Sequence, residues 1–184
     1  MFDNFEELEE SIKGCEKCKL CKNRTNIVFG AGNKSADVMF IGEGPGADED
    51  EQGIPFVGRA GKLMNEAFRG IGIDRNGVYI ANVVKCRPPM NRNPESDEVE
   101  SCLNYLRNQV VLVNPKIVVL LGNVALKAIL GNEYSITSSR GKWVEKKKIK
   151  YMPTFHPAAL LRDESKKMDF WKDLKLVAEE MKKL

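Results

Sequence analysis

The sequence predicts an α/β fold in which helices cover both faces of a parallel sheet. Apolar runs alternate with amphipathic stretches along the chain, which is typical of strands connected through helices. Three of these runs, residues 38–41, 78–80 and 151–155, end directly in loops that contain Gly or Pro or a polar side chain. Right-handed crossovers between such strands give a parallel α/β/α sandwich. At 184 residues the chain suits one domain, residues 1–184, with a substantial core.

Five segments carry apolar residues at helical spacing and predict amphipathic helices. They cover residues 4–13, 61–70, 96–113, 124–130 and 168–183. The first is expected to stop at Gly14, and Asn93-Pro94-Glu95 is expected to start the third. Acidic residues early in the third segment also favour a helix N-terminus, because they complement the helix dipole.

Apolar runs bounded by turn residues predict the strands. They cover residues 36–41, 77–84 and 117–121, followed by a hairpin or extended pair over 142–154. The run 117–121 is expected to be the clearest buried strand, since Asn114-Pro115 leads into it and Gly122-Asn123 follows it.

Composition and charge exclude several classes of protein. Hydrophobic residues make up 42% and charged residues 30% of the chain, which is ordinary for a globular domain. The net charge of +3 is small, so a polyanionic partner must be met by a local patch. No apolar stretch approaches the roughly 20 residues that span a bilayer. The acidic, amphipathic N-terminus does not fit a signal peptide, so a cytoplasmic location is expected.

Five cysteines in a reducing compartment favour metal ligands over disulfides. Cys15, Cys18 and Cys21 form a C-x2-C-x2-C stretch, and a C-x2-C pair presents two thiolates from one loop. We take Cys15 and Cys18 as the pair and Cys21 as the spare, although Cys18 with Cys21 has the same spacing. Cys86 and Cys102 would complete a zinc site or a [4Fe–4S] cluster, or else be small buried hydrophobes. A metal there would pin the N-terminal segment onto the domain.

Loops that follow the predicted strands carry three chemically important side chains. Glu43 lies in the glycine loop 42–46, Asn82 follows the second run, and His156, the only histidine, follows the third. Ligands of open α/β sheets bind beyond the carboxyl ends of the strands, so these side chains are expected to converge on one pocket. The acidic run 48–51 predicts a solvated loop and would repel the phosphates of a dinucleotide.

Each of these loop residues also has a plain structural explanation. A Gly/Pro turn commonly follows a strand, Asn82 is a common turn residue, and a lone histidine is often structural. Phe56, in a rigid turn, is equally suited to stacking on a planar base and to core packing. The amide of Asn82 has the donors and the acceptor to match a base edge. The position of His156 at a strand end beside a proline favours catalysis.

Four motifs together resemble the family 4 uracil-DNA glycosylases, the thermostable iron–sulfur type of bacteria and archaea. In order, the motifs are residues 42–46, 53–61, 82–89 and 156–162. The resemblance implies a uracil-DNA glycosylase fold, a three-layer α/β/α sandwich with a central four-stranded parallel sheet. It also implies DNA repair by uracil excision. The implied ligands of a [4Fe–4S] cluster are Cys15, Cys18, Cys86 and Cys102.

The same resemblance implies a role for each loop residue. The residues around uracil would be Gly42, Glu43, Gly44, Phe56, Asn82 and His156. Phe56 would stack on the base and Asn82 would read its amide edge. His156 would face the carbonyl oxygen that gains charge. From the chemistry of bond cleavage we predict two catalytic residues: His156, which donates to that oxygen, and Glu43, which stabilises the sugar cation and orients water. Gly44 stands where the best-known uracil glycosylases have an aspartate, so the water-activating base is not carried over.

Further residues are expected to contact DNA. Leu160, Leu161 and Arg162 are placed to wedge into the stack that the flipped base leaves. Phosphate contacts would make binding salt-sensitive. The candidates for these contacts are Lys85, Arg87, Arg92, Arg140, Lys142 and Arg162. The expected partner is uracil-containing DNA, single- or double-stranded, bound by a monomer at the nucleoid and not at a membrane. The competing hypotheses are a zinc-stapled nucleic-acid-binding module and an iron–sulfur redox or sensor protein.

Overall fold

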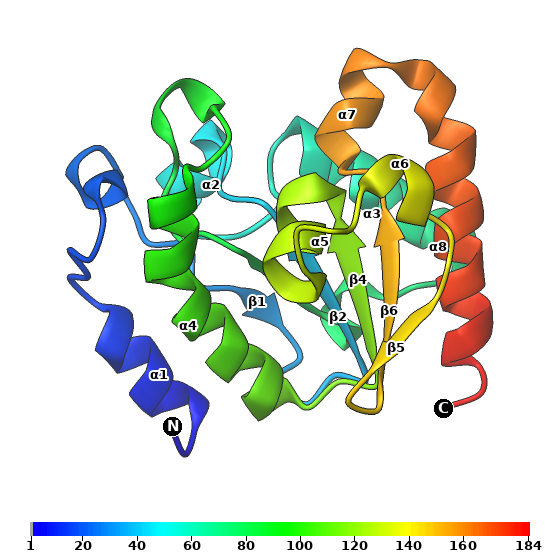
Figure 1. The fold of residues 1–184 in the computed structure, drawn as a ribbon, viewed down its shortest axis with the longest axis horizontal. Coiled ribbons are helices and arrows are strands. Elements are labelled where there is room, and N and C mark those ends of the chain that lie inside the picture. The colour runs from blue at the N-terminus through cyan, green and yellow to red at the C-terminus, as the bar shows by residue number, and fades with distance from the viewer. Residues whose placement is uncertain (1) are drawn as a thin grey trace.

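The computed structural model describes residues 2–184, which form helices on a single six-stranded sheet (Figure 1). The strand order is β1-β3-β2-β4-β6-β5. The strands are β1 (Ala31–Gly32), β2 (Val38–Gly42), β3 (Tyr79–Asn82), β4 (Ile117–Leu121), β5 (Val144–Lys146) and β6 (Ile149–Thr154). The four central strands are parallel, whereas β1 and β5 pair antiparallel at the edges. The expected four-stranded parallel sheet is therefore the centre of a larger mixed sheet.

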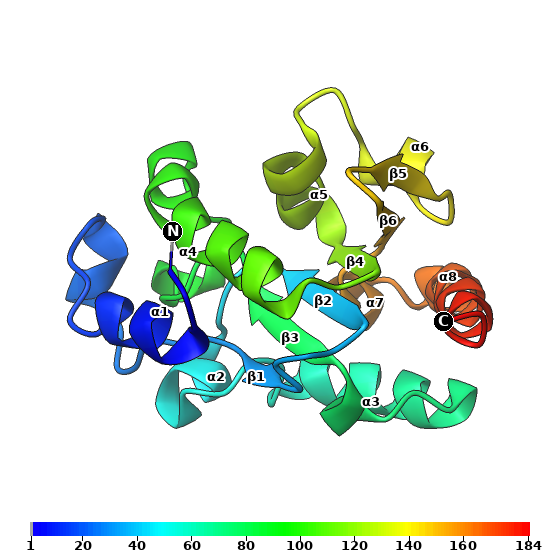
Figure 2. The ribbon, with the colours of Figure 1, turned by 90° about the horizontal axis from the view of Figure 1, so that it is seen from below.

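Helices cover both faces of this sheet. They are α1 (Phe5–Ile12), α2 (Ala47–Gln52), α3 (Arg59–Ile71), α4 (Ser96–Val113), α5 (Gly122–Leu130), α6 (Ile136–Ser139), α7 (Pro157–Arg162) and α8 (Lys167–Met181). Short 3-10 helices are η1 (Lys19–Lys22), η2 (Arg75–Gly77), η3 (Pro89–Asn91) and η4 (Glu164–Lys166). Figure 2 shows α1, α4 and α5 on one face and α2 and α3 on the other. Every helix within residues 2–184 is too short or too polar to span a membrane.

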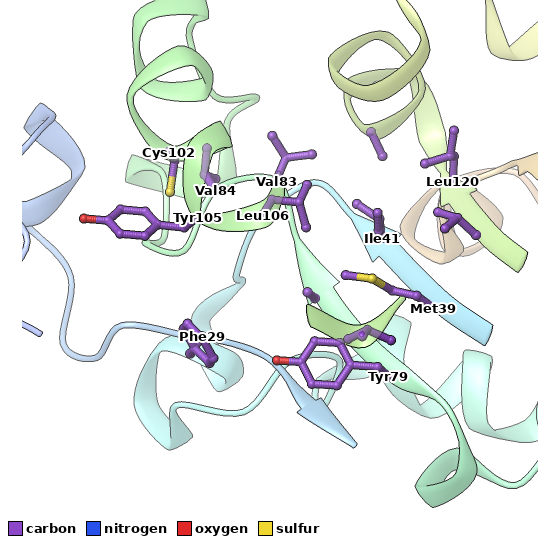
Figure 3. Close-up of a cluster of buried hydrophobic side chains, with 14 of the residues drawn as sticks. Phe29, Met39, Ile41, Tyr79, Val83, Val84, Cys102, Tyr105, Leu106 and Leu120 are labelled. Atoms are coloured by element: carbon purple, nitrogen blue, oxygen red, sulfur yellow. The ribbon is translucent and has the colours of Figure 1, made fainter. Parts of the chain in front are cut away.

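The central strands bury side chains on both faces. Met39 and Ile41 of β2 belong to the core beneath α1, α4 and α5, whereas Val38 and Phe40 belong to the core beneath α3 and α8. Figure 3 shows the first of these clusters, with Met39 and Ile41 on the strand and Leu106 on α4. Because neither face meets water, β2 and β4 are continuous apolar runs rather than alternating ones.

The parallel strands end at one edge, and this edge sets the position of the site. Gly42 at the end of β2 is in register with Asn82 at the end of β3. Leu121 at the end of β4 is in register with Thr154 at the end of β6. The loops that follow these strands therefore begin side by side.

The acidic run 48–51 is not the solvated loop that its composition predicts. It forms most of α2, and the side chains of Glu49 and Asp50 are buried. The Glu49 carboxylate accepts the backbone N–H groups of Val57 and Gly58 at 3.1 and 2.9 Å. Asp50 accepts two backbone N–H groups of the N-terminal loop at 2.9 and 3.2 Å. The prediction was wrong because these carboxylates satisfy loop amides that are distant in sequence, which no local pattern reveals.

Candidate active site

A cleft of about 380 Å³ opens beyond the carboxyl ends of the parallel strands. Its lining comes from the loop after β2, the turn before α3, the end of β3, residues 88–93 and the start of α7. The predicted residues that line it are Glu43, Gly44, Phe56, Asn82, Arg92, His156 and Arg162, whereas Gly42 is not part of the lining. The structure thus brings together side chains that are up to 119 positions apart in the chain (43 to 162).

Gly42 allows the walls of this cleft to approach one another. A Cβ atom at Gly42 would lie 2.5 Å from Oδ1 of Asn82 and 2.5 Å from Cζ of Phe56. A Cβ atom at Gly44 would lie 2.7 Å from a methyl group of Val84. All three distances are shorter than van der Waals contact, so a side chain at Gly42 or Gly44 would push its neighbours away.

Phe56 packs in the core and also lines the cleft. Its side chain is only 4% exposed and belongs to the core beneath α3, yet it also lines the cleft. Its ring lies 5.5 Å from the ring of His156, with 30° between the planes. The residue has a φ of +52°, and a Cβ atom at Gly61 would lie 2.0 Å from its carbonyl oxygen. Gly61 thus lets the first turn of α3 hold Phe56 in this unusual conformation.

Asn82 presents a polar atom that lacks a partner. The residue is 2% exposed, and its Oδ1 atom is buried with no hydrogen-bond donor among residues 2–184. A buried, unpaired acceptor costs about 1–3 kcal/mol. The Asn82 backbone carbonyl, in contrast, accepts a hydrogen bond from Nζ of Lys85 at 2.8 Å. The backbone at this position is therefore satisfied while the side-chain oxygen is left for a ligand that donates.

His156 is held as a neutral imidazole at the N-terminus of α7. Its Nδ1 atom accepts the backbone N–H of Ala158 at 3.0 Å, so the proton of the neutral ring resides on Nε2. Burial, helped by the positive charge of Arg162, lowers the pKa of His156 to about 4. At neutral pH the side chain therefore offers one N–H donor without a charge.

Glu43 lies on the same cleft in a partly dry environment. Burial raises the pKa of Glu43, and the positive charge of Arg162 opposes this rise. The carboxylate is therefore a stronger base than an exposed glutamate.

The predicted wedge of three residues is only partly available. Leu160 is fully buried in the core beneath α7, so its assignment to DNA intercalation was wrong. Leu161 is 38% exposed and Arg162 is exposed on the cleft wall. Successive helical residues point about 100° apart, so α7 cannot present both leucines to DNA.

Three of the predicted phosphate contacts have partners within the protein. Lys85 is fully buried, and its Nζ atom donates to the Asn82 carbonyl and to Oε1 of Gln109, at 2.8 and 2.6 Å. Its prediction as a phosphate contact was wrong. Arg140 pairs with the buried carboxylate of Asp173. Arg92 lines the cleft and makes a two-pronged pair with Glu98 at 2.8 and 2.9 Å.

Several residues of the cleft escaped sequence reasoning. They are Asp48, Glu49, Arg59, Asn91 and Asn93. Asp48 and Glu49 lie in the acidic run. Because this run follows the glycine loop directly, its position in the sequence could have indicated that it lines the cleft. Asn91 follows a Pro-Pro pair in a segment with no secondary-structure pattern, and nothing local places it against the strand ends.

The cysteines gather at a second place, away from the cleft. Cys15, Cys18, Cys21, Cys86 and Cys102 line one pocket between the N-terminal segment, the loop after β3 and α4. Three of the sulfurs accept hydrogen bonds. Arg24 donates to Cys86 at 3.4 Å, the Lys85 backbone N–H to Cys102 at 3.3 Å, and the Tyr105 hydroxyl to Cys15 at 3.6 Å. No three His, Cys, Asp or Glu side chains within residues 2–184 are grouped as the ligands of one metal ion.

Comparisons with known proteins identify the family of this chain. The family model described as the uracil DNA glycosylase superfamily matches residues 29–175. The type-4 uracil-DNA glycosylase of Sulfurisphaera tokodaii is 45% identical over 96% of this chain and 84% of its own length. The enzymes of the same name from Thermotoga maritima and Archaeoglobus fulgidus are 47% and 40% identical, over 89% and 96% of this chain and 86% and 93% of their own lengths. With this match over most of its length, the chain belongs to the uracil-DNA glycosylase superfamily.

Proposed function

We propose that this protein flips uracil out of DNA and hydrolyses its N-glycosidic bond, which releases free uracil and leaves an abasic site. The observation that carries the proposal is the buried Oδ1 atom of Asn82, which has no partner among residues 2–184, in a cleft that also contains Phe56 and His156. The names of the relatives support the same reaction. The proposed enzyme acts as a monomer on single- or double-stranded DNA in the cytoplasm, at the nucleoid.

Asn82 is proposed to select the base. Its Oδ1 atom accepts the N3–H of uracil, and its amide nitrogen donates to O4. Cytosine has an acceptor at N3 and an amine donor at position 4. The acceptor Oδ1 would therefore face another acceptor, and the amide donor would face another donor. A site that leaves buried polar groups unpaired with the wrong ligand discriminates strongly against that ligand. Phe56, held rigidly against the helix, supplies the flat surface on which the ring stacks.

His156 is proposed to stabilise the departing base. When the N1–C1′ bond breaks, its electron pair stays on uracil and places negative charge on the carbonyl oxygens. The Nε2–H of the neutral imidazole donates to one of these oxygens. Since the ring is already fixed by its bond to Ala158, the donor needs no reorientation as charge develops.

Glu43 is proposed to act on the sugar side of the same bond. Loss of uracil leaves cationic character at C1′, which a nearby carboxylate stabilises. The same carboxylate orients the water whose oxygen bonds to C1′. The raised pKa of Glu43 makes it a better acceptor for a hydrogen bond or proton from that water.

In double-stranded DNA the uracil nucleotide must flip out of the base stack before this chemistry begins. Extrusion costs a few kcal/mol of unstacking, and the free base must fit a pocket that is closed on its Watson–Crick edge. Arg162 and Arg92 on the cleft walls are proposed to contact the phosphates, which would make binding salt-sensitive.

We also propose a [4Fe–4S] cluster on Cys15, Cys18, Cys86 and Cys102. The donor set fits, because these sulfurs line one pocket and N–H or O–H groups reach three of them. Each thiolate of such a cluster binds a different iron, so the four need not meet at one point. When bound, the cluster supplies a cross-link that ties the N-terminal segment to α4 and to the loop after β3. The cluster takes no part in the chemistry that we propose, which is performed by the residues of the cleft.

The proposal is tested with an oligonucleotide that contains one uracil. After incubation with the protein, alkali cleaves the strand wherever an abasic site has formed. We expect cleavage at uracil only, with matched strands that carry cytosine or thymine at that position left intact. Intact uracil strands, in both single- and double-stranded form, would refute the proposed function.

A further inference from the structure

The cleft wall away from α7 carries the most exposed large apolar side chain among residues 2–184. Met90, in η3, is 95% exposed. Its neighbours Pro88, Asn91 and Arg92 line the cleft, so Met90 stands at the rim. In Figure 1 the loop that leads into α4 and the helix α7 both rise from the end of the molecule at which the parallel strands finish.

The backbone at this rim is both unusual and firmly held. Met90 and Asn91 each have a φ of +54°, the left-handed region that residues other than glycine rarely adopt. The Asn91 side chain accepts a hydrogen bond from Nε of Arg87 at 2.8 Å. The backbone N–H groups of Asn91 and Arg92 donate to the carbonyls of Pro88 and Pro89, at 3.1 and 3.2 Å. The turn is thus built to hold a conformation that directs Met90 into solvent, and such strain concentrates at functional sites.

The charges around Met90 favour a nucleic acid as its partner. Arg87 and Arg92 lie on either side of it in sequence, and Arg162 lies on the other wall of the cleft. The charge of Arg92 is paired with the carboxylate of Glu98, so the positive charge near the rim comes mainly from Arg87 and Arg162. An apolar tip between guanidinium groups matches DNA, which presents phosphates outside and flat apolar bases inside the stack.

We propose that Met90 inserts against the base stack beside the flipped nucleotide. This inference rests on the proposed function. Because Leu160 is buried, α7 offers one leucine, Leu161, and Met90 supplies a second apolar contact from the opposite rim. The thioether side chain is unbranched and adaptable, so it packs against bases of different shape. Met90 therefore assists only where a stack exists, in double-stranded substrate.

The first test compares Met90→Ala with the unaltered protein on one uracil oligonucleotide, single-stranded and annealed to its complement. We expect kcat/KM on the duplex to fall about tenfold, the size of a lost stacking contact, and kcat/KM on the single strand to stay within about twofold. Met90→Leu, which keeps an apolar side chain of similar size, should restore most of the duplex activity. The matched control is Val111→Ala, which removes another exposed apolar side chain, 56% exposed on α4, outside the cleft lining. It should change neither rate.

A second experiment measures base unstacking in a duplex that the protein cannot cleave. The duplex carries 2′-fluoro-2′-deoxyuridine, which resists cleavage, next to 2-aminopurine, which fluoresces when it is unstacked. The unaltered protein and Val111→Ala should raise the fluorescence, and Met90→Ala should raise it less at saturating protein.

The possible failures are distinguishable. Equal loss of activity on both substrates, or no loss on either, with uracil excision intact in the unaltered protein, would overturn the role of Met90 alone. Failure of the unaltered protein to excise uracil from either substrate would overturn the proposed function.

Discussion

We propose that the side-chain amide of Asn82 decides which base the cleft accepts. Replacing Asn82 by Asp removes the amide donor that we assign to O4 of uracil. We expect kcat/KM on uracil to fall about 10- to 100-fold, the effect of one unmade buried hydrogen bond, and activity on cytosine to appear. Excision assays on otherwise identical uracil and cytosine strands measure both. Full uracil activity without cytosine activity in Asn82→Asp would show that this residue does not read the base.

The role that we propose for His156 depends on one N–H group. We expect His156→Ala to lower kcat by about 10²–10³-fold, as removal of a preorganised oxyanion donor does in other enzymes. DNA affinity should hardly change, because the ring contributes to the transition state rather than to phosphate binding. Single-turnover rates and binding to 2′-fluoro-2′-deoxyuridine duplex separate the two effects. Unchanged turnover with unchanged affinity would contradict the role.

The pH dependence of the rate should report Glu43. As pH falls through the raised pKa of this residue, the carboxylate that we assign to the sugar cation and to water is lost, so kcat should decline. The decline should begin above the ordinary glutamate value of about 4.3. His156 should not add a second decline near pH 6.5, because its pKa is about 4. In Glu43→Gln the rate should be low and flat across this acid range. An acid limb that survives in Glu43→Gln would assign it to another group.

At the scale of elements, the contact between α3 and the turn before it should be sensitive to one methyl group. A Cβ atom at Gly61 would lie 2.0 Å from a backbone oxygen, which cannot rotate away as a side chain can. We expect Gly61→Ala to lower the free energy of unfolding by about 1–3 kcal/mol. Gly77→Ala is the matched control, because its new Cβ would meet only ordinary contacts of 3.8 and 3.9 Å at an ordinary φ. Urea denaturation compares the two. Equal midpoints would show that the turn relaxes freely.

Some helices were predicted from local sequence patterns and others were not. The spacing of apolar residues predicts α1, α3, α4, α5 and α8, because each buries one face against the sheet. Helix α2 was not predicted, since its sequence is acidic and its burial depends on amides supplied by residues 25–26 and 57–58. The two leucines of α7 are equivalent in the sequence, and only the packing of the helix separates buried Leu160 from Leu161.

At the scale of the whole molecule, the cysteine pocket lies where the N-terminal segment, the loop after β3 and α4 meet. Cys86→Ser removes a proposed ligand, and we expect the protein to lose absorbance near 400 nm, bound iron and several degrees of thermal stability. Cys21→Ser is the matched control, because it changes the same pocket but not the proposed ligand set. It should retain about four irons per chain. Iron content and thermal unfolding after anaerobic purification measure the outcome. Equal iron loss in both variants would show that the ligand assignment is wrong.

The sequence by itself determined the central strands, the long helices and the loops after the strands, because apolar periodicity and glycine act through neighbouring residues. It also determined that Glu43, Asn82 and His156 would follow strand ends. Only the tertiary structure decided which polar groups lack a hydrogen-bond partner and which charged groups are paired inside the protein. Within residues 2–184, the side-chain oxygen of Asn82 has no partner. Lys85 donates to buried acceptors, and the carboxylates of the acidic run accept hydrogen bonds from backbone amides. The reason is physical: a hydrogen-bond partner is defined by proximity in space, and a linear pattern carries no information about which distant group will be near.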